Sequence, residues 1–513
     1  MDTPRLLRPF LTVGGWTMAS RILGFARDIM IGAFLGSSVV AEAFLAAFSL
    51  PNMFRRFFAE GALNVAFVPM FAKKLEGGEG PHEFAQDAMS GLLFVLLLFT
   101  ILGQVFMPWL VYAMASGFAD DARFDLAVIF GRIAFPYILF ISIAALLSGV
   151  LNALHKFAAA AAAPVLLNVI FVSAMVTASL SGWDMGYTLA WTVPVAGIAQ
   201  VVLVWIAASR AGYRLIPRRP RMTPELKRLA IIAAPAALAG GVTQVNLLVG
   251  RQVASFFEGA FAWLYYADRL YQLPLGVVGI AIGIVLLPDL SRRLRAGDTD
   301  GSREALSRAG ELSLSLTIPA SVALIVIPGP LVEVLFQRGA FTADDTARTA
   351  LVTAVYGLGL PAFVMAKVLQ PVYFARGNTR TPFHFALVAM VVNAVLAIGL
   401  STWLGYIAAA VGTTVAGWSM TLLLWFGAAR MGPETRLDAR FWARFWRIIA
   451  ASWLMGAVLW MGVIVLGPMF GAGALRYLAL AILVTLGMVS YFAIGQMLGA
   501  FRLQDFKAAM RRG

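Results

Sequence analysis

The 513-residue chain contains no cysteine and only three histidines. Without cysteine, disulfides and thiolate metal ligands are excluded, and the redox state of the compartment cannot be inferred. His82, His155 and His384 lie far apart with no ligand spacing, so we expect no metal site. The glycines form no phosphate-cradling loop, and no catalytic constellation is visible. We therefore expect a protein that is not an enzyme and binds no cofactor.

Charged residues are also scarce, at 13% of the chain, whereas hydrophobic residues make up 60%. A soluble domain carries nearer a quarter charged residues, so the composition predicts an integral membrane protein. The net charge of +14 would suit a nucleic-acid-binding protein. However, most basic residues lie in short loops between apolar runs, which is typical of membrane proteins, and we expect no nucleic-acid partner.

Fourteen apolar segments are long enough to cross a bilayer, since about 20 residues of helix span ~30 Å of hydrocarbon. They are continuous and lack the alternation of β-barrel strands. The predicted fold is an all-α integral membrane protein with about 14 transmembrane helices. The segments are residues 11–35, 39–72, 85–115, 122–152, 160–181, 186–209, 226–256, 262–291, 306–328, 346–376, 380–404, 406–430, 444–467 and 472–501.

The loop charges alternate in agreement with this count. The tails and the loops after even-numbered helices contain 28 of the 40 Lys and Arg residues, and those after odd-numbered helices contain only Arg123, Arg338, Arg348 and Arg476. Basic loops stay cytoplasmic, so we expect both termini on the cytoplasmic side. The first apolar segment contains charged residues and no cleavage site, which predicts a retained helix and not a signal peptide.

An internal repeat divides the chain. Pro69 is followed by Lys73 and Lys74, as Pro288 is by Arg292 and Arg293, and Pro136 precedes Asn168 by the 32 residues that separate Pro361 from Asn393. We predict two six-helix lobes related by a pseudo-two-fold axis along the membrane normal, plus two extra C-terminal helices. The expected boundaries are residues 1–215 (helices 1–6), 216–432 (helices 7–12) and 433–513 (helices 13–14 and a cytoplasmic tail).

Eight basic residues fall inside the predicted spans, where an arginine costs about 2.5–3.5 kcal/mol on insertion scales. They are Arg21, Arg27, Arg55, Arg56, Arg132, Arg251, Arg269 and Lys367, and the acids there are chiefly Asp28, Glu42, Glu60 and Asp268. Arg132 and Arg251 lie near span ends and can snorkel to water. Glu60 follows Arg56 by one helical turn and can neutralise it. The rest indicate an excess of positive charge within the membrane.

The placement of these arginines predicts an anion site. Arg21 and Arg27 are on helix 1, Arg55 on helix 2 and Arg269 on helix 8, and helices 1–2 and 7–8 occupy equivalent positions in the two halves. Pro51 predicts a break in helix 2 just before Arg55. Planar guanidinium groups bind phosphate oxygens in pairs, so converging arginines favour an anionic cargo with a phosphate or diphosphate.

Three stretches resemble the MurJ/MviN lipid II flippases of the multidrug, oligosaccharidyl-lipid and polysaccharide exporter superfamily. They are Ser20–Asp28, Leu50–Arg56 with Phe58–Gly61, and Tyr265–Leu270. The resemblance covers essentially the whole chain. It implies a multi-pass flippase of the bacterial inner membrane that moves lipid II, a polyprenyl-diphosphate-linked peptidoglycan precursor, by alternating access through a central cationic cavity. A hydrophobic groove involving helices 13 and 14 would take the polyprenyl tail.

The resemblance assigns substrate binding to Arg21, Arg27, Arg55 and Arg269. The expected supporting or gating residues are Ser20, Asp28, Glu42, Asn52, Arg56, Glu60, Asp268 and Lys367, with Glu42 replacing the family's usual aspartate. We expect a monomer in contact with membrane lipid. A flippase for another polyprenyl-diphosphate-linked oligosaccharide remains an alternative. A drug exporter of the same superfamily, which would need an acidic cavity for its cationic cargo, is a weaker one.

Overall fold

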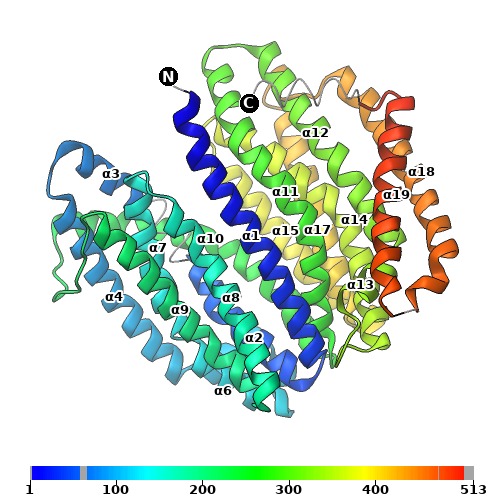
Figure 1. Ribbon diagram of the computed structural model, residues 1–513. Coiled ribbons are helices and arrows are strands. Elements are labelled where there is room, and N and C mark those ends of the chain that lie inside the picture. The colour runs from blue at the N-terminus through cyan, green and yellow to red at the C-terminus, as the bar shows by residue number, and fades with distance from the viewer. Residues whose placement is uncertain (1–2, 58–65, 472, 502–513) are drawn as a thin grey trace. The chain divides into compact units, whose positions relative to one another are not determined.

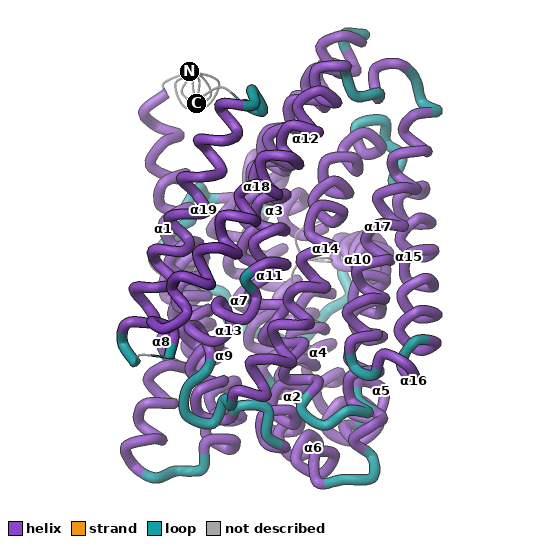
Figure 2. The backbone as a smooth tube through the Cα atoms, turned by 90° about the vertical axis from the view of Figure 1, so that its right-hand side faces the viewer, coloured by secondary structure: helices purple, strands orange, loops and turns teal. Residues whose placement is uncertain are grey.

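The computed structural model describes residues 3–57, 66–471 and 473–501. Throughout these ranges the regular structure is helical and no strand is present (Figure 2). Ten of the described helical stretches are long and apolar enough to cross a membrane. The prediction of an all-helical membrane protein is confirmed.

Within the described residues, each of the fourteen predicted segments overlaps one helix or two helices in series. The first ten helices are α1 (Thr3–Leu35), α2 (Val39–Arg55), α3 (Val68–Gly77), α4 (Pro81–Val105), α5 (Met107–Met114), α6 (Ala122–Ala134), α7 (Tyr137–Ala153), α8 (Ala158–Ser181), α9 (Met185–Arg210) and α10 (Pro224–Ser255). The others are α11 (Ala260–Arg295), α12 (Thr299–Val326), α13 (Pro328–Phe336), α14 (Ala343–Phe374), α15 (Arg380–Gly399), α16 (Ser401–Leu404), α17 (Ile407–Ala429), α18 (Ala439–Phe470) and α19 (Leu475–Met497).

Prolines explain where several predicted segments are interrupted. A proline lacks an N–H and is tolerated best in the first turn of a helix. Pro136 separates α6 from α7, and Pro108 lies in the first turn of α5 directly after α4. Pro51 does not behave this way, so the predicted break there is wrong: α2 continues through it to Arg55. The helix widens instead into a π-type turn at residues 56–57.

The chain folds into two compact units, residues 1–262 and 263–513. In the first unit α8 packs against both α1 and α9, α7 packs against α9, and α2 packs against α6 (Figure 1). Stacked aromatic rings pack between α3 and α4 in its core. The ring centroid of Phe67 lies 5.6 Å from that of Phe71 and 5.7 Å from that of Phe84. In the second unit α12, α14 and α17 pack together, and α18 pairs with α12 and α19.

Candidate functional site

A cavity of about 570 Å³ lies within the first unit, between α1, α2, α7, α8 and α9. Its size is within the ~300–1,000 Å³ typical of ligand pockets. Two guanidinium groups line it, from Arg21 on α1 and Arg55 on α2. Among the described residues of the lining none is acidic. The cavity is therefore positively charged and suited to an anion.

The sequence of α1 explains how Arg21 reaches this cavity. Val13, Thr17, Ser20 and Arg21 all line it. Residues three and four apart fall on one face of a helix, so this spacing turns a single stripe of α1 toward the cavity. The stripe becomes more polar toward Arg21. The structure therefore brings Ser20 and Arg21 together with Arg55 at one cavity, and their role in substrate binding stays a prediction.

Uncharged polar groups also line the cavity. Ser148 and Asn152 come from α7, one helical turn apart, and Gln200 comes from α9. Gln200 is fixed, because its Nε2 donates to the carbonyl of Ala163 at 2.9 Å and its Oε1 accepts from the Tyr137 hydroxyl at 3.2 Å. Alanines of α8 complete the lining and leave room for a ligand. These groups add hydrogen-bonding capacity to the lining without adding charge.

Arg27 has a different environment from Arg21 and Arg55. It is buried and does not belong to the cavity lining. Its Nη2 lies 2.8 Å from Oδ1 of Asp28, and its Nη1 donates to Oδ1 of Asn168 at 3.0 Å. The rings of Phe48 and Phe171 lie 5.7 and 5.4 Å from the guanidinium carbon. Its charge is thus compensated within the protein, and Arg27 joins α1 to α2 and α8.

Asn168 links this network to the cavity. Its Nδ2 donates to the backbone carbonyl of Ser20 at 3.0 Å while its Oδ1 accepts from Arg27. The two helices approach closely at Gly24: a Cβ at that position would stand 3.3 Å from the Asn168 amide nitrogen, and the amide would have to shift by a few tenths of an ångström. One amide therefore positions both the buried arginine and the stretch of α1 that presents Ser20 and Arg21.

The other predicted site residues lie in several environments. Asn52 donates to the carbonyl of Phe48 at 2.9 Å, and the exposed Arg56 donates to Gln244 at 3.4 Å. Glu60 lies outside the described residues, so its pairing with Arg56 stays a prediction.

In the second unit the guanidinium carbon of Arg269 lies 4.5 Å from the ring centroid of Tyr265, and Gln272 donates to Asp268. Lys367 is exposed on α14. The prediction that Arg269 acts together with the arginines of α1 and α2 stays a prediction.

The buried contacts of Glu42 are the second notable feature of the first unit. It is fully buried near the start of α2. Its Oε2 accepts from Nη1 of Arg123 at 2.9 Å, and its Oε1 accepts from the backbone N–H of Phe261 at 2.9 Å. The second bond satisfies one of the N–H groups that are left without a partner in the first turn of α11. Glu42 thus ties the α10–α11 turn to α2 and α6.

Neighbouring contacts strengthen this clamp, which we define as Glu42, Arg123 and Phe261. The N–H of Gly117 donates to the Ser255 hydroxyl at 3.0 Å, and a Cβ on Gly117 would lie 2.5 Å from the backbone of α10. Arg123 also pairs with Asp121, and its hydrogen bond lowers the pKa of the Asp121 carboxyl. Arg123 therefore bridges two acids, one on α2 and one directly before α6.

Sequence reasoning misses three of these residues. Arg123 falls at the margin of a predicted loop, Asn168 serves there only as a repeat marker, and Gln200 is not among the predicted site residues. The available signal is polarity: Asn168 and Gln200 are uncharged amides inside apolar spans, and buried amides in lipid normally mark a hydrogen-bonded contact between helices.

The comparisons with known proteins extend over nearly the whole chain. The family model described as "Lipid II flippase MurJ" matches residues 31–485. A Rhizobium meliloti protein named "Probable lipid II flippase MurJ" is 45% identical over 518 residues, covering 99% of this chain and 97% of that protein. The "Lipid II flippase MurJ" of Burkholderia cenocepacia is 35% identical, covering 83% and 84% of the two chains.

Two solved structures are similar to this chain over most of its length. A lipid II flippase MurJ in an inward closed conformation matches with a TM-score of 0.79 and 25% identity, covering 94% of this chain and 98% of that one. An inward-facing multidrug transporter of the MATE family matches with a TM-score of 0.66 at 13% identity, covering 84% and 99%. The second similarity is one of fold alone.

Proposed function

Because this chain belongs to the MurJ family of lipid II flippases, we propose that it carries lipid II from the cytoplasmic to the periplasmic leaflet of the bacterial inner membrane. The observation that supports this most directly is the cavity lined by Arg21 and Arg55. Hydrocarbon excludes the diphosphate and sugar head of such a lipid, and the diphosphate is its strongly anionic part. Two guanidinium groups provide the bidentate donors that phosphate oxygens accept.

The polar lining supports a head group that is larger than phosphate. Besides the two arginines, Ser148, Asn152 and Gln200 contribute hydroxyl and amide groups to the lining. Sugars bind through such neutral hydrogen-bonding groups, so the charged and the neutral polar groups match the two parts of a glycosylated diphosphate. Another polyprenyl-diphosphate-linked oligosaccharide has the same two parts and stays an alternative cargo. A cationic drug is disfavoured, because the arginines would repel it.

We further propose that the clamp opens and closes during alternating access. Glu42 lies near the start of the second predicted span, and its partners Arg123 and Phe261 lie at the starts of the fourth and eighth. All three residues are at span ends predicted to be periplasmic. In this proposal, exposure of the cavity to that side moves the α10–α11 turn away from α2 and α6 and breaks both bonds.

The first test of this function is genetic rescue. Expression of the chain in a bacterium depleted of its own lipid II flippase should restore growth, because the chain then supplies the missing transport of lipid II. A multidrug exporter of the same superfamily, accumulated to the same level, is the control and should fail. If the chain reaches the membrane and growth is not restored, lipid II transport is excluded.

The loop charges further support cytoplasmic termini, and cysteine labelling tests this orientation. The native chain has no cysteine. Cysteines replacing the exposed Ser181 or Thr402 should react with an impermeant thiol reagent in intact spheroplasts. Cysteines replacing the exposed Glu79 or Asp300 should react only after lysis. Labelling of Asp300→Cys from outside would contradict both the helix count and the orientation.

A further inference from the structure

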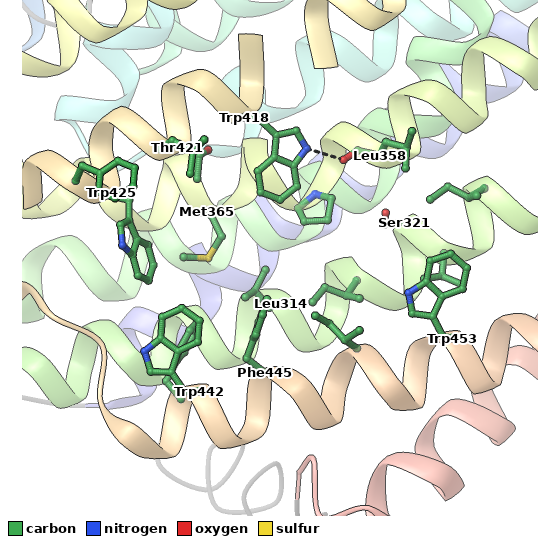
Figure 3. Close-up of a pocket in the computed structure, with 18 residues that line it drawn as sticks. Leu314, Ser321, Leu358, Met365, Trp418, Thr421, Trp425, Trp442, Phe445 and Trp453 are labelled. Carbon is green, nitrogen blue, oxygen red and sulfur yellow. Dashed lines mark hydrogen bonds between the residues drawn. The ribbon is translucent and has the colours of Figure 1, made fainter. Parts of the chain in front are cut away.

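A second cavity, of about 510 Å³, lies in the second unit between α12, α14, α17 and α18 (Figure 3). Its lining is almost wholly apolar, and four tryptophans contribute to it: Trp418, Trp425, Trp442 and Trp453. The last two are on α18, whereas α19 contributes no lining residue. Trp418 and Trp453 are also exposed at the protein surface, so the cavity opens toward the surrounding solvent, which for these helices is lipid.

The polar atoms of this cavity already have partners. The Ser321 hydroxyl donates to the carbonyl of Gly357 at 2.6 Å, and the Thr421 hydroxyl donates to that of Ala362 at 2.6 Å. The indole N–H of Trp418 donates to the carbonyl of Leu358 at 3.0 Å, as Figure 3 shows. A ligand here would gain little from hydrogen bonds and much from apolar contact. The chemistry of the cavity is that of a hydrocarbon chain.

Arginines gather at one end of the cavity. Glu311, which is buried one helical turn before the lining residue Leu314, accepts from Arg444 at 3.0 Å, pairs with Arg308, and lies 3.8 Å from Arg440. Arg440 and Arg444 alternate along α18 with the lining residues Phe441, Trp442 and Phe445. The charged cluster and the apolar cavity are therefore adjacent on both α12 and α18.

The cluster contains more positive charge than its acids neutralise. Residues 303–311 and 436–447 together hold six arginines and three acids, a net formal charge of +3. The side chain of Arg440 is 46% exposed. A hydrocarbon cavity that ends at an exposed cationic cluster fits an amphiphile whose acyl chain carries an anionic head.

We propose that this cavity is a binding site for one acyl chain of an anionic phospholipid, whose phosphate lies against Arg440 and its neighbours. The cluster is on the side predicted to be cytoplasmic, where basic residues face anionic lipid heads. The ligand stays bound as part of the transporter's lipid environment. Its site shares no lining residue with the cavity of Arg21 and Arg55. The site does not depend on which lipid the protein transports.

Photo-crosslinking of the full chain tests the site. The protein is reconstituted in phosphatidylcholine vesicles with a trace of phosphatidylglycerol that carries a diazirine in its acyl chain, and adducts are located by mass spectrometry. We expect adducts on peptides of α12 and α18, enriched several-fold over those from diazirine-labelled phosphatidylcholine. Arg440→Gln should reduce the enrichment about fivefold, the effect of one basic residue near anionic lipid. Arg348→Gln, at the start of α14, is the matched control and should not.

Two outcomes would overturn the proposal. Equal labelling by the two lipids would mean that bulk lipid covers an apolar surface without recognition of charge. Displacement of the phosphatidylglycerol adduct by an equimolar polyprenyl diphosphate would assign the cavity to a polyprenyl chain instead. A Val322→Trp variant, which fills the cavity, should abolish the adducts while Arg348→Gln keeps them, and persistence of the adducts there would exclude the cavity. Because flipping is not measured, failure here leaves the proposed function standing.

Discussion

Replacing Arg55 by alanine is expected to abolish growth rescue and to lower lipid II flipping by roughly 10- to 150-fold. The variant loses charge-assisted hydrogen bonds to the cargo's phosphate, each of which contributes about 1.5–3 kcal/mol. Arg21→Ala should behave in the same way, because both guanidinium groups line one cavity. The measurement is flipping of a labelled lipid II by protein reconstituted in vesicles, together with growth of the depleted strain.

Two variants show whether the loss reflects the cavity. Arg132→Ala removes the same charge from an exposed position on α6 outside the cavity lining, and it should flip normally. Arg55→Lys should recover only part of the activity, because an ammonium group cannot donate to two oxygens in the planar guanidinium geometry. Normal flipping by the double variant Arg21→Ala/Arg55→Ala would contradict a phosphate site in this cavity.

Replacing Glu42 by alanine is expected to destabilise the protein by about 3 kcal/mol, within the range for breaking a buried ion pair from one side. Arg123, which is only 7% exposed, would lose one of its two carboxylates, and the first turn of α11 would lose an acceptor. Thermal unfolding of the purified protein in detergent measures the change.

Matched variants separate the two bonds of the clamp. Glu42→Gln keeps a carbonyl oxygen for the N–H of Phe261 but loses the ion pair, so it should unfold between the wild type and Glu42→Ala. Adding Arg123→Met to Glu42→Ala should recover part of the stability, because the buried charge is then gone. If Glu42→Ala unfolds at the wild-type temperature, the clamp carries no stability and cannot hold the α10–α11 turn.

The positions of the helices and of Arg21 and Arg55 could be predicted from sequence because their signals are local. Twenty apolar residues define a span wherever they occur, and an arginine in the middle of a span is conspicuous by itself. The interruption at Pro136 follows from the missing N–H of one residue. Pro51 obeys the same chemistry, yet α2 continues through it, because packing in the membrane can re-satisfy the freed carbonyl groups.

The contacts that determine the role of each charge could not be predicted, because they join distant parts of the chain. Arg27 meets Asn168 across 141 residues, and Glu42 meets Arg123 across 81. Charge within a span predicts one role for Arg27, Arg21 and Arg55, whereas in the structure Arg27 is compensated within the protein and the other two side chains line a cavity. The predicted role of Arg27 in substrate binding stays a prediction. Arg123 could not be singled out, because its position beside a loop gives no sign of its buried ion pair with Glu42.

The clamp also constrains the order in which the chain is made. Glu42 meets Arg123 after 81 further residues but meets the N–H of Phe261 only after 219. At roughly 5–20 residues per second, ribosomes need about 7–28 s to synthesise the stretch between these two partners. We expect the Glu42 carboxylate to pair with Arg123 during that interval, before the α10–α11 turn exists to complete the clamp.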